Sequence, residues 1–464
     1  MTAHASRRVM LAIAACAVAA SCTRTVRSNG WNVLLITYET TRADHVGAYG
    51  YGRDTTPRLD ALASKGVLFE NAITASPRTN PSLASLMTSQ YPQVHGVRNL
   101  LLPLEPENRT LAEVLRDAGY RTHAVQTHPR LVRHSGFEQG FESYDDDYAA
   151  HPLAEQACAS VVEWIGRQRG TRPWFVWLHL MDPHWTYDPP PAWRESFAPE
   201  HPLPAEVYRK LRDREITIGP LIYQNRMSPE EVAGFVNLYD AELRYTDHAV
   251  GALLDGMEAL GALERTLVVV SADHGESLGE NHYFFEHGAY GGQAEIRVPL
   301  VLYAGGRLPE GVRVPATVRN IDVAPTIVEF VEAGHEPAFG GVPLQPLVSG
   351  EGGDRSCFGE TDQVFHDEFA AREVEGVLGK WRWLQRGRFK LVHRPKRDAA
   401  PERVLYDLDS PEGETADVRE SHPEVFAALA REMDALLAGD VRPAREYHIT
   451  EEARDILRSL GYVN

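Results

Sequence analysis

Four short apolar runs, rich in β-branched and aromatic residues, recur along the chain and have the length of buried strands. They cover residues 32–37, 122–126, 174–180 and 266–271. Between them, apolar residues recur three and four positions apart, as in an amphipathic helix, at 57–69, 111–119, 154–169 and 229–260. Strands that alternate with helices predict an α/β fold in which a mostly parallel sheet is sandwiched by helices.

The pattern changes after about residue 345, where short alternating runs replace the long helical ones. The elements predicted beyond it are a glycine-rich linker at 349–353, a β-hairpin at 381–393, a strand at 404–408 and short amphipathic helices at 425–437 and 451–460. We therefore predict a catalytic α/β domain at 32–345 and a small C-terminal antiparallel α+β subdomain at 346–464.

Three of the predicted strands end in clusters of histidine and carboxylate side chains. Glu39 follows the first strand, Asp182-Pro183-His184 follows the third, and Asp273-His274-Gly275-Glu276 follows the fourth. One polar residue after a strand is usually turn chemistry. In an open parallel sheet, however, the carboxyl ends of the strands form the ligand crevice. Three such clusters on one edge therefore predict a functional site.

The N-terminal residues have the pattern of an export signal. The pair Arg7-Arg8 precedes a small apolar run at 10–20, which is too short to span a bilayer. Ser21-Cys22 follows as in a bacterial lipoprotein processing site, with an ordinary cleaved signal or a twin-arginine signal as alternatives. We expect residues 1–21 to be removed, 22–31 to be a linker, and the protein to lie in the cell envelope, lipid-anchored through Cys22, or in the periplasm.

The net charge argues against two classes of binding partner, and the cysteine content argues against a disulfide-rich fold. The formal net charge of −18 disfavours nonspecific binding to nucleic acid or to an anionic membrane. An anionic substrate would therefore need a metal ion or a local cation cluster. Beyond Cys22 the chain holds only Cys158 and Cys357, which could pair but make no disulfide framework.

Seven segments, in chain order, resemble sulfatases of the alkaline phosphatase superfamily. They are 32–51 (NVLLITYETTRADHVGAYGY), 56–97, 179–190 (HLMDPHWTYDPP), 239–247, 271–280 (SADHGESLGE), 297–303 and 321–327. The resemblance runs through most of 32–415. It implies an alkaline phosphatase/sulfatase-like fold and a metal-dependent hydrolase that cleaves a sulfate or phosphate-type ester.

The resemblance places the nucleophile at Thr79. The family motif C/S-x-P-S-R reads Thr79-Asn80-Pro81-Ser82-Leu83 here. With Asn80 as N-cap and Pro81 in the first turn, Thr79 would lie at a helix N-terminus, which favours anions. A merely capping threonine is the alternative. Sulfatases oxidise Cys or Ser here to formylglycine, whereas threonine lacks that route and Leu83 replaces the motif's arginine. We therefore expect no formylglycine, as in superfamily members that cleave phosphodiesters and phosphonates with an unmodified threonine.

The resemblance also implies a metal site formed by Glu39, Asp273 and His274. Oxygen and imidazole donors suit one divalent ion, with Ca²⁺, Mn²⁺, Mg²⁺ and Zn²⁺ all compatible. Glu39 replaces the usual aspartate, and Thr40 stands where many sulfatases have a second one. A weaker site, or a salt bridge from Glu39 to Arg42, is therefore the alternative.

Four further side chains complete the site that the resemblance implies. His184 would contact the ester group, and His287 would give a proton to the leaving oxygen. Arg42 and Lys390 would contact the anion. The alternatives are a solvated loop histidine for His287 and surface salt bridges for the two cations. Four residues near these motifs receive no chemical role: His179, interpreted as structural, and Arg78, His95 and His128.

Three functions remain open from the sequence: a hydrolase of a sulfate or phosphate-type ester, a phosphodiesterase or phosphonate monoester hydrolase, and a catalytically inactive binding protein. The substrate could be a small molecule, a glycan or a lipid ester. Residues 189–224 are rich in proline and aromatic side chains but carry no motif that distinguishes these classes.

Overall fold

The computed structural model describes residues 28–147, 153–168, 172–197, 228–280, 283–361, 380–396 and 400–439. The export signal with Cys22, the predicted helix at 451–460 and most of 189–224 lie outside the described residues. Within the described ranges, no helix combines the length and the apolar character that crossing a bilayer requires.

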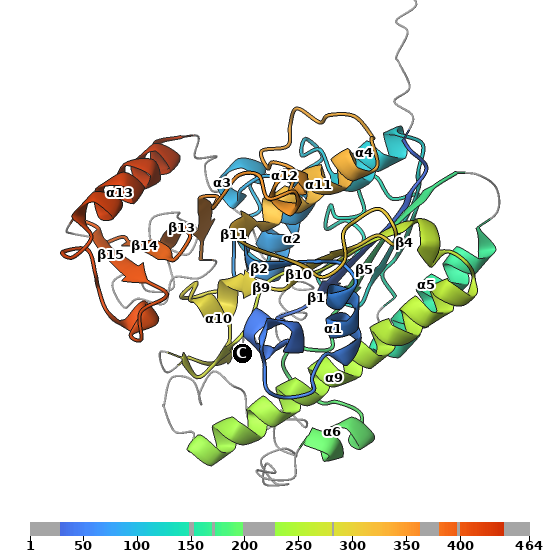
Figure 1. Ribbon diagram of the computed structural model, residues 1–464, viewed down its shortest axis with the longest axis horizontal. Helices are drawn as coiled ribbons and strands as arrows, with labels where there is room; N and C mark the ends of the chain where they lie inside the picture. Colours follow the sequence, from blue (N-terminus) through green and yellow to red (C-terminus); the bar gives the residue numbers. More distant parts are fainter. Residues whose placement is uncertain are drawn as a thin grey trace, which may run out of the picture.

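A nine-stranded sheet forms the centre of the molecule (Figure 1). Its order is β11-β2-β10-β6-β1-β5-β3-β4, and β9 pairs with β2. The strands are β1 Asn32–Tyr38, β2 Val67–Ile73, β3 Arg121–Gln126, β4 Ser143–Asp145, β5 Trp174–Leu180, β6 Thr266–Ala272, β9 Arg297–Val298, β10 Leu300–Tyr303 and β11 Val312–Arg319. Strands β6, β1, β5, β3 and β4 run parallel, whereas β10 is antiparallel to β6 and β2. The predicted mostly parallel sheet is confirmed.

The four predicted strands appear as β1, β3, β5 and β6, with ends within one residue of the prediction. Strands β5 and β6 are buried along their whole length, and β1 is buried except at its first residue. Strands covered on both faces need apolar side chains on both faces, which explains their continuous apolar runs.

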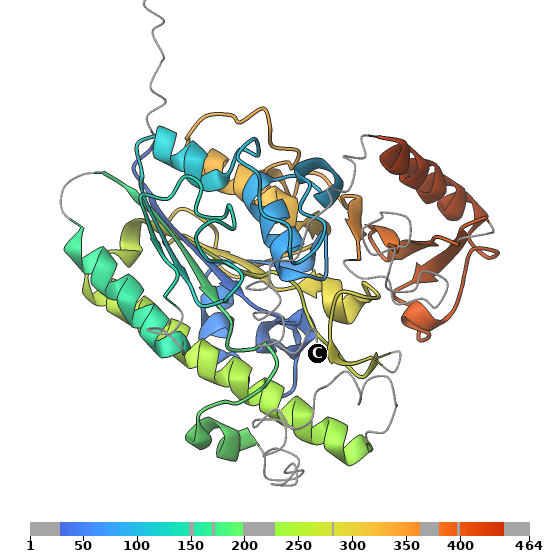
Figure 2. The same ribbon diagram turned by 180° about the vertical axis from the view of Figure 1, so that it is seen from behind.

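Helices cover both faces of the sheet, as the two opposite views show (Figures 1 and 2). One layer contains α1 Pro57–Ser64, α5 Ala154–Arg167, α6 Pro191–Phe197 and α9 Pro229–Ala259. The other contains α2 Thr79–Thr88, α3 Pro92–His95, α4 Leu111–Asp117, α11 Val323–Phe330 and α12 Gln345–Val348. The domain boundary predicted near residue 345 falls at α12, and its position stays a prediction.

The predicted helix at 57–69 is wrong at its C-terminal end. Helix α1 ends at Ser64, and the next apolar residues begin strand β2. Gly66 separates the two elements, and a Cβ atom there would lie 2.3 Å from the carbonyl oxygen of Leu302 in β10. Strand β2 is stabilised by β10 and β11, which lie more than 200 residues later in the chain, so local spacing did not reveal it.

A four-stranded antiparallel sheet follows the main one. It consists of β12 Cys357–Glu360, β13 Arg382–Arg386, β14 Phe389–Arg394 and β15 Glu402–Asp407, with helix α13 Pro423–Ala438 packed on it. The predicted hairpin is confirmed by the pairing of β13 with β14. Cys158 and Cys357 are buried in separate apolar clusters, so these two thiols do not pair.

Several short elements connect these strands and helices. They are the ribbon strands β7 Ser277–Leu278 and β8 Phe284–Glu286, helix α10 Gln293–Ile296, and the 3-10 helices η1 Ala43–His45, η2 Gly47–Tyr49, η3 Leu263–Arg265, η5 Asn320–Asp322 and η8 Gly413–Thr415.

Candidate metal centre and active site

The polar clusters that follow β1, β5 and β6 meet at one edge of the sheet. Strand β1 lies between the other two, and Tyr38 pairs with both Leu180 and Ala272. The next residue, Glu39, therefore emerges level with Asp273 and the end of β5. This arrangement confirms that the strand-end clusters share an edge.

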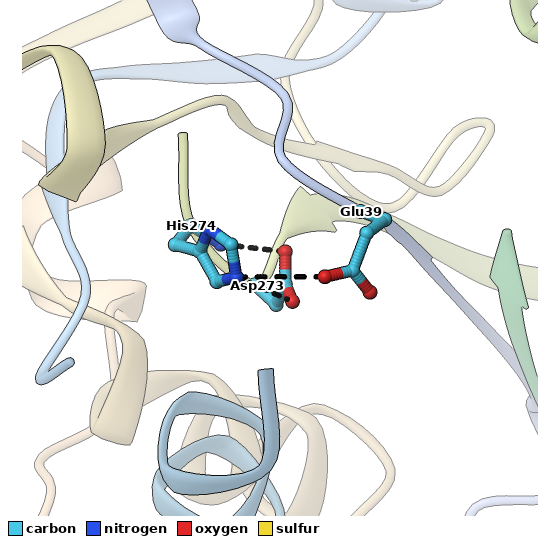
Figure 3. Close-up of side chains that lie close together, drawn as sticks. All are labelled: Glu39, Asp273 and His274. Carbon is cyan, nitrogen blue, oxygen red and sulfur yellow. Dashed lines mark hydrogen bonds and ion pairs between the residues drawn. The ribbon is translucent and has the colours of Figure 1, made fainter. Parts of the chain in front are cut away.

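Glu39, Asp273 and His274 point toward one another in the interior (Figure 3). One ligand atom from each lies within 4.8 Å of the others, and all three side chains are fully buried. His274 Nε2 lies 3.3 Å from Asp273 Oδ2 and 3.5 Å from Glu39 Oε1. His274 Nδ1 donates to the carbonyl of Gly275 at 2.8 Å, which leaves the lone pair of Nε2 directed at the two carboxylates.

The three residues fit a divalent ion. Asp273 Oδ1 accepts hydrogen bonds from the backbone N–H groups of Thr40 and His274. Asp273 Oδ2 is buried and has no hydrogen-bond partner among the described residues. Burial, followed by the negative charge of Glu39, raises the pKa of Asp273 well above its ordinary value. A cation would satisfy the unpaired oxygen and offset the repulsion between the carboxylates.

His179 supports the metal group, so its interpretation as merely structural is incomplete. Its Nε2 lies 2.8 Å from Glu39 Oε2, and its Nδ1 lies 2.9 Å from Thr37 Oγ1. The Thr37 hydroxyl accepts from Trp177 Nε1, so it can donate its own proton to Nδ1 and leave the ring proton on Nε2. Burial opposes ionisation of Glu39, but the nearby His128 and the hydrogen bond from His179 outweigh it and hold the pKa of Glu39 well below its ordinary value.

Thr40 lies outside the metal group although it directly follows Glu39. Its Oγ1 donates to the carbonyl of Pro183 at 2.8 Å, and its carbonyl accepts from the Tyr239 hydroxyl. Its φ of 47° is in the left-handed region, which is strained for a β-branched residue. Thr40 therefore fixes the reversal of the chain after Glu39 and supplies only its backbone N–H to Asp273.

Thr79 is brought into the metal group. Its Oγ1 donates to Glu39 Oε1 at 2.7 Å and lies 3.5 Å from His274 Nε2. Helix α2 begins at Thr79 with Arg78 as N-cap, so the prediction of Asn80 as N-cap is wrong. The Thr79 hydroxyl is bonded to a carboxylate rather than to the helix backbone, which contradicts the interpretation of a capping threonine.

His184 and His287 both lie beside the metal group. The His287 ring centroid is 4.3 Å from that of His274 and 5.4 Å from that of His184. His184 Nδ1 donates to the carbonyl of Trp185 at 2.5 Å. Burial lowers the pKa of both rings, and for His287 the neighbouring His274 lowers it further. His287 is 2% exposed, which contradicts the solvated-loop interpretation.

Glu276 is a site residue whose role the sequence analysis missed. Its Oε1 lies 2.9 Å from His287 Nδ1, and its Oε2 accepts from the Tyr187 hydroxyl at 3.0 Å. Burial, and then the charge of Glu286, raises the pKa of Glu276 well above its ordinary value. Because the raised pKa of Glu276 favours the protonated acid, Glu276 can donate to Nδ1 of the neutral His287 ring, which fixes the orientation of the ring and places its proton on Nε2. The signal for Glu276 in the sequence was its place in the cluster that follows the fourth predicted strand, two residues after His274.

Arg42 and Lys390 form ion pairs with acidic side chains, and their predicted contact with the anion stays a prediction. Arg42 donates to Asp44 and to Glu280, each at 2.7 Å. Lys390 Nζ lies 2.5 Å from Glu414 Oε1. Both cations therefore make ion pairs of the kind that the alternative interpretation expects.

The sulfatase family model matches residues 31–333, which is more than half of the chain. The chain belongs to the sulfatase family. It is 28% identical over 350 residues to the ulvan-active sulfatase of Formosa agariphila, covering 68% of this chain and 65% of that protein. It is 25% identical over 381 residues to the arylsulfatase of Clostridium perfringens, covering 68% of this chain and 78% of that protein.

A solved structure gives the same fold. The phosphonate monoester hydrolase of Agrobacterium radiobacter superposes with a TM-score of 0.69 and 21% identity, covering 91% of this chain and 98% of that one. The alkaline phosphatase/sulfatase-like architecture is therefore confirmed. Family membership supports a hydrolase that acts on ester bonds.

Proposed function

We propose that this sulfatase-family chain is a divalent-metal-dependent hydrolase that cleaves a sulfate or phosphate-type ester with Thr79 as nucleophile. One observation carries the proposal. The Thr79 hydroxyl is 2.7 Å from Glu39 Oε1, within the group formed by Glu39, Asp273 and His274, and it stands on the first residue of a buried helix. A nucleophile beside a metal group and a helix N-terminus suits an anionic ester.

The residues present define what a metal would contribute. An ion bound by Glu39, Asp273 and His274 would supply a Lewis acid that offsets negative charge and lowers the pKa of a neighbouring hydroxyl. Two carboxylates and one imidazole are compatible with Ca²⁺, Mn²⁺, Mg²⁺ or Zn²⁺, and we propose one ion of this group. His179 would orient Glu39 through its 2.8 Å hydrogen bond.

The reaction proposed for these side chains has two parts. Thr79 Oγ1 gives its hydroxyl proton to Glu39 Oε1, its acceptor at 2.7 Å, and forms a bond to phosphorus or sulfur. The bond to the leaving oxygen breaks, and that oxygen takes a proton from His287 Nε2. A water molecule then gives one proton to His287 Nε2 and bonds its oxygen to phosphorus or sulfur while the bond to Thr79 Oγ1 breaks, and Glu39 returns the proton to the Thr79 oxygen. The N-terminus of α2 would stabilise the anionic ester, and His184, whose ring centroid is 5.4 Å from that of His287, would contact the ester oxygens.

A phosphodiester or phosphonate monoester is the second candidate substrate class. Thr79 lacks the route to formylglycine, and Leu83, which replaces the motif's arginine, is fully buried in the main apolar core. The helix thus has no cation at the position that accompanies the aldehyde in sulfatases. The fold shared with a phosphonate monoester hydrolase is consistent with this candidate.

Turnover by metal-loaded protein tests the function. A nitrophenyl phosphonate monoester, a bis(nitrophenyl) phosphate and a nitrophenyl sulfate would be compared with each of the four metals. We expect Thr79→Ala to lower kcat about 1,000-fold or more. The matched control is Thr88→Ala, since Thr88 is buried in the same helix and its hydroxyl donates to the carbonyl of Ala84.

A covalent adduct on the peptide that contains Thr79, trapped by rapid acid quench, would support the nucleophile directly. Its mass distinguishes phosphate, phosphonate and sulfate. If no ester class is turned over with any metal while Thr79→Ala retains ligand affinity, the proposal is wrong and the inactive binding protein is the better interpretation.

The substrate and the location of the enzyme belong to the same proposal. The relatives named above support a small-molecule or glycan ester, and a lipid ester remains compatible with an envelope protein. Export rests on residues 1–21, and lipid attachment rests on Cys22. Mass analysis of the mature N-terminus, with Cys22→Ser as control, decides between a lipoprotein and a soluble periplasmic form.

A further inference from the structure

The loop that carries His287 is held from the outside by the C-terminal sheet. We define the His287 loop as residues 287–293. Lys390 Nζ donates to the carbonyl of Gly291 at 2.5 Å and pairs with Glu414 Oε1 at 2.5 Å. Glu414 Oε2 accepts from the backbone N–H of Gln293 at 2.6 Å. Two linked side chains of the C-terminal part thus bind two backbone groups of one short loop.

The fit between loop and sheet is also steric. Gly291 has a φ of +62°, and a Cβ atom there would lie 2.4 Å from the Trp383 ring. Trp383 is 1% exposed, so the ring has little room to move. Gln293 Nε2 additionally donates to Gln385 Oε1 at 2.8 Å. In Figure 1 the C-terminal sheet lies beside α10, which begins at Gln293.

The other side of the loop is bound by the α/β domain. Arg78 Nη2 and the Tyr283 hydroxyl both donate to the carbonyl of His287, at 2.8 and 2.9 Å. Glu295 Oε2 accepts from the backbone N–H groups of Gly288 and Gly291, at 3.1 and 3.3 Å. The His287 loop is therefore held on one side by the α/β domain and on the other side by the C-terminal sheet.

Lys390 is an unusual residue for a purely structural contact. Its side chain is 1% exposed, and burying an ammonium is costly unless its hydrogen bonds and charge are matched. The Gly291 carbonyl and Glu414 provide that match, and they specify one position of the loop relative to β14. An apolar side chain of the same length would fill the same space but would not fix the position of the loop.

We propose that Lys390 and Glu414 form a clasp through which the C-terminal sheet positions His287. The chemical consequence rests on the function proposed above. Glu276 fixes His287 at Nδ1, and the clasp fixes the loop, so that Nε2 stays within reach of the leaving oxygen. A displacement of about 1 Å at such an atom can cost about 100-fold in rate. Lys390 and Glu414 are thus positioning residues.

Leaving-group dependence tests this role in the full-length, metal-loaded protein. Two esters of the same acid would be compared: a nitrophenyl ester, whose oxygen leaves without a proton, and an alkyl ester, whose oxygen needs one. We expect Lys390→Met to lower kcat for the alkyl ester about 10-fold or more and to change the nitrophenyl rate much less. Lys390→Arg should restore part of the loss.

Three comparisons separate the clasp from other roles. In the His287→Gln background, Lys390→Met should add no further loss, because both changes remove the same proton transfer. Gly291→Ala, which pushes the loop away from Trp383, should give the same leaving-group pattern. Arg388→Met removes a half-exposed cation from the same sheet and should leave both rates unchanged. Equal losses on both esters, or a loss that adds to that of His287→Gln, would overturn the proposal in favour of direct anion contact.

Hydrogen exchange tests, independently of turnover, whether the clasp holds the His287 loop in place. The amides of Gly288 and Gly291 are bonded to Glu295, so their exchange reports whether the loop stays in place. Lys390→Met should raise exchange in the peptide at 283–296 about 10-fold and leave strand β5 unchanged. An unchanged rate would overturn the clasp even if the esters are turned over. If the wild-type protein cleaves neither ester, the proposed function fails, and faster exchange would still support the clasp.

Discussion

Replacing Asp273 by asparagine should have opposite effects on stability with and without metal. In the metal-free protein, the substituted side chain would keep the acceptor oxygen for the N–H groups of Thr40 and His274. Its amide nitrogen would take the place of Oδ2, which lies 3.3 Å from His274 Nε2, and could donate a hydrogen bond to that nitrogen. The variant therefore gains a hydrogen bond and loses one of two adjacent buried negative charges.

The magnitudes follow from these contacts. A net hydrogen bond contributes about 1 kcal/mol, and relief of repulsion from Glu39 adds to it, so metal-free Asp273→Asn should be about 1–3 kcal/mol more stable than wild type. The wild-type protein should gain about 4 kcal/mol at a free metal concentration about 1,000 times its Kd. The variant has lost a charged ligand and should gain less than about 1 kcal/mol at the same concentration. Without metal, Asp273→Asn should therefore be more stable than wild type, and with metal the wild-type protein should be the more stable of the two.

The assay is urea unfolding at about pH 8, where free carboxylates are ionised, in chelator and in excess metal. Asp240→Asn is the control, because Asp240 is also fully buried but pairs with His45 and Arg53 away from the metal group. That variant should be destabilised equally with and without metal. A metal-free Asp273→Asn protein less stable than wild type would refute the repulsion argument, and equal stabilisation of both by metal would refute the ligand assignment.

Three further predictions concern residues around the site. His179→Ala should weaken metal affinity about 10- to 100-fold in a chelator competition, because Glu39 loses its 2.8 Å donor; unchanged affinity would mean that His179 does not act through Glu39. Burial raises the pKa of Asp182 to about 6. The folded state thus retains this proton to higher pH than the unfolded state. The contribution of Asp182 to stability is therefore fully present below about pH 4 and is lost as pH rises through about 6, by about 3 kcal/mol. Asp182→Asn should flatten that fall in urea unfolding from about pH 4 to 7, and an identical slope would contradict the assignment. Cys158 and Cys357 should react with a thiol reagent only after unfolding, and a disulfide-linked peptide between them in protein digested without reductant would contradict the structure.

The main sheet and its helices were largely determined by local sequence. Strands β1, β5 and β6 are buried, so their apolar runs could be recognised without knowledge of their partners. Parallel pairing then required the residues after these strands to share an edge, which brought Glu39, Asp273 and His274 together. A functional site at this edge could therefore be predicted from the strands, whereas the metal ligands and the place of Thr79 were implied by the family resemblance.

Only the tertiary structure decided which side chains contact the residues of the site. Thr79 and Glu39 are 40 residues apart, and Thr79 and His274 are 195 apart, so no local pattern records their contact. The same holds for strand β2, which β10 and β11 stabilise from a distant part of the chain. Arg42 and Lys390 matched a family pattern, but their charges are neutralised by acids brought close by folding. Periodicity is a property of neighbours in sequence, whereas ion pairs and strand pairing depend on neighbours in space.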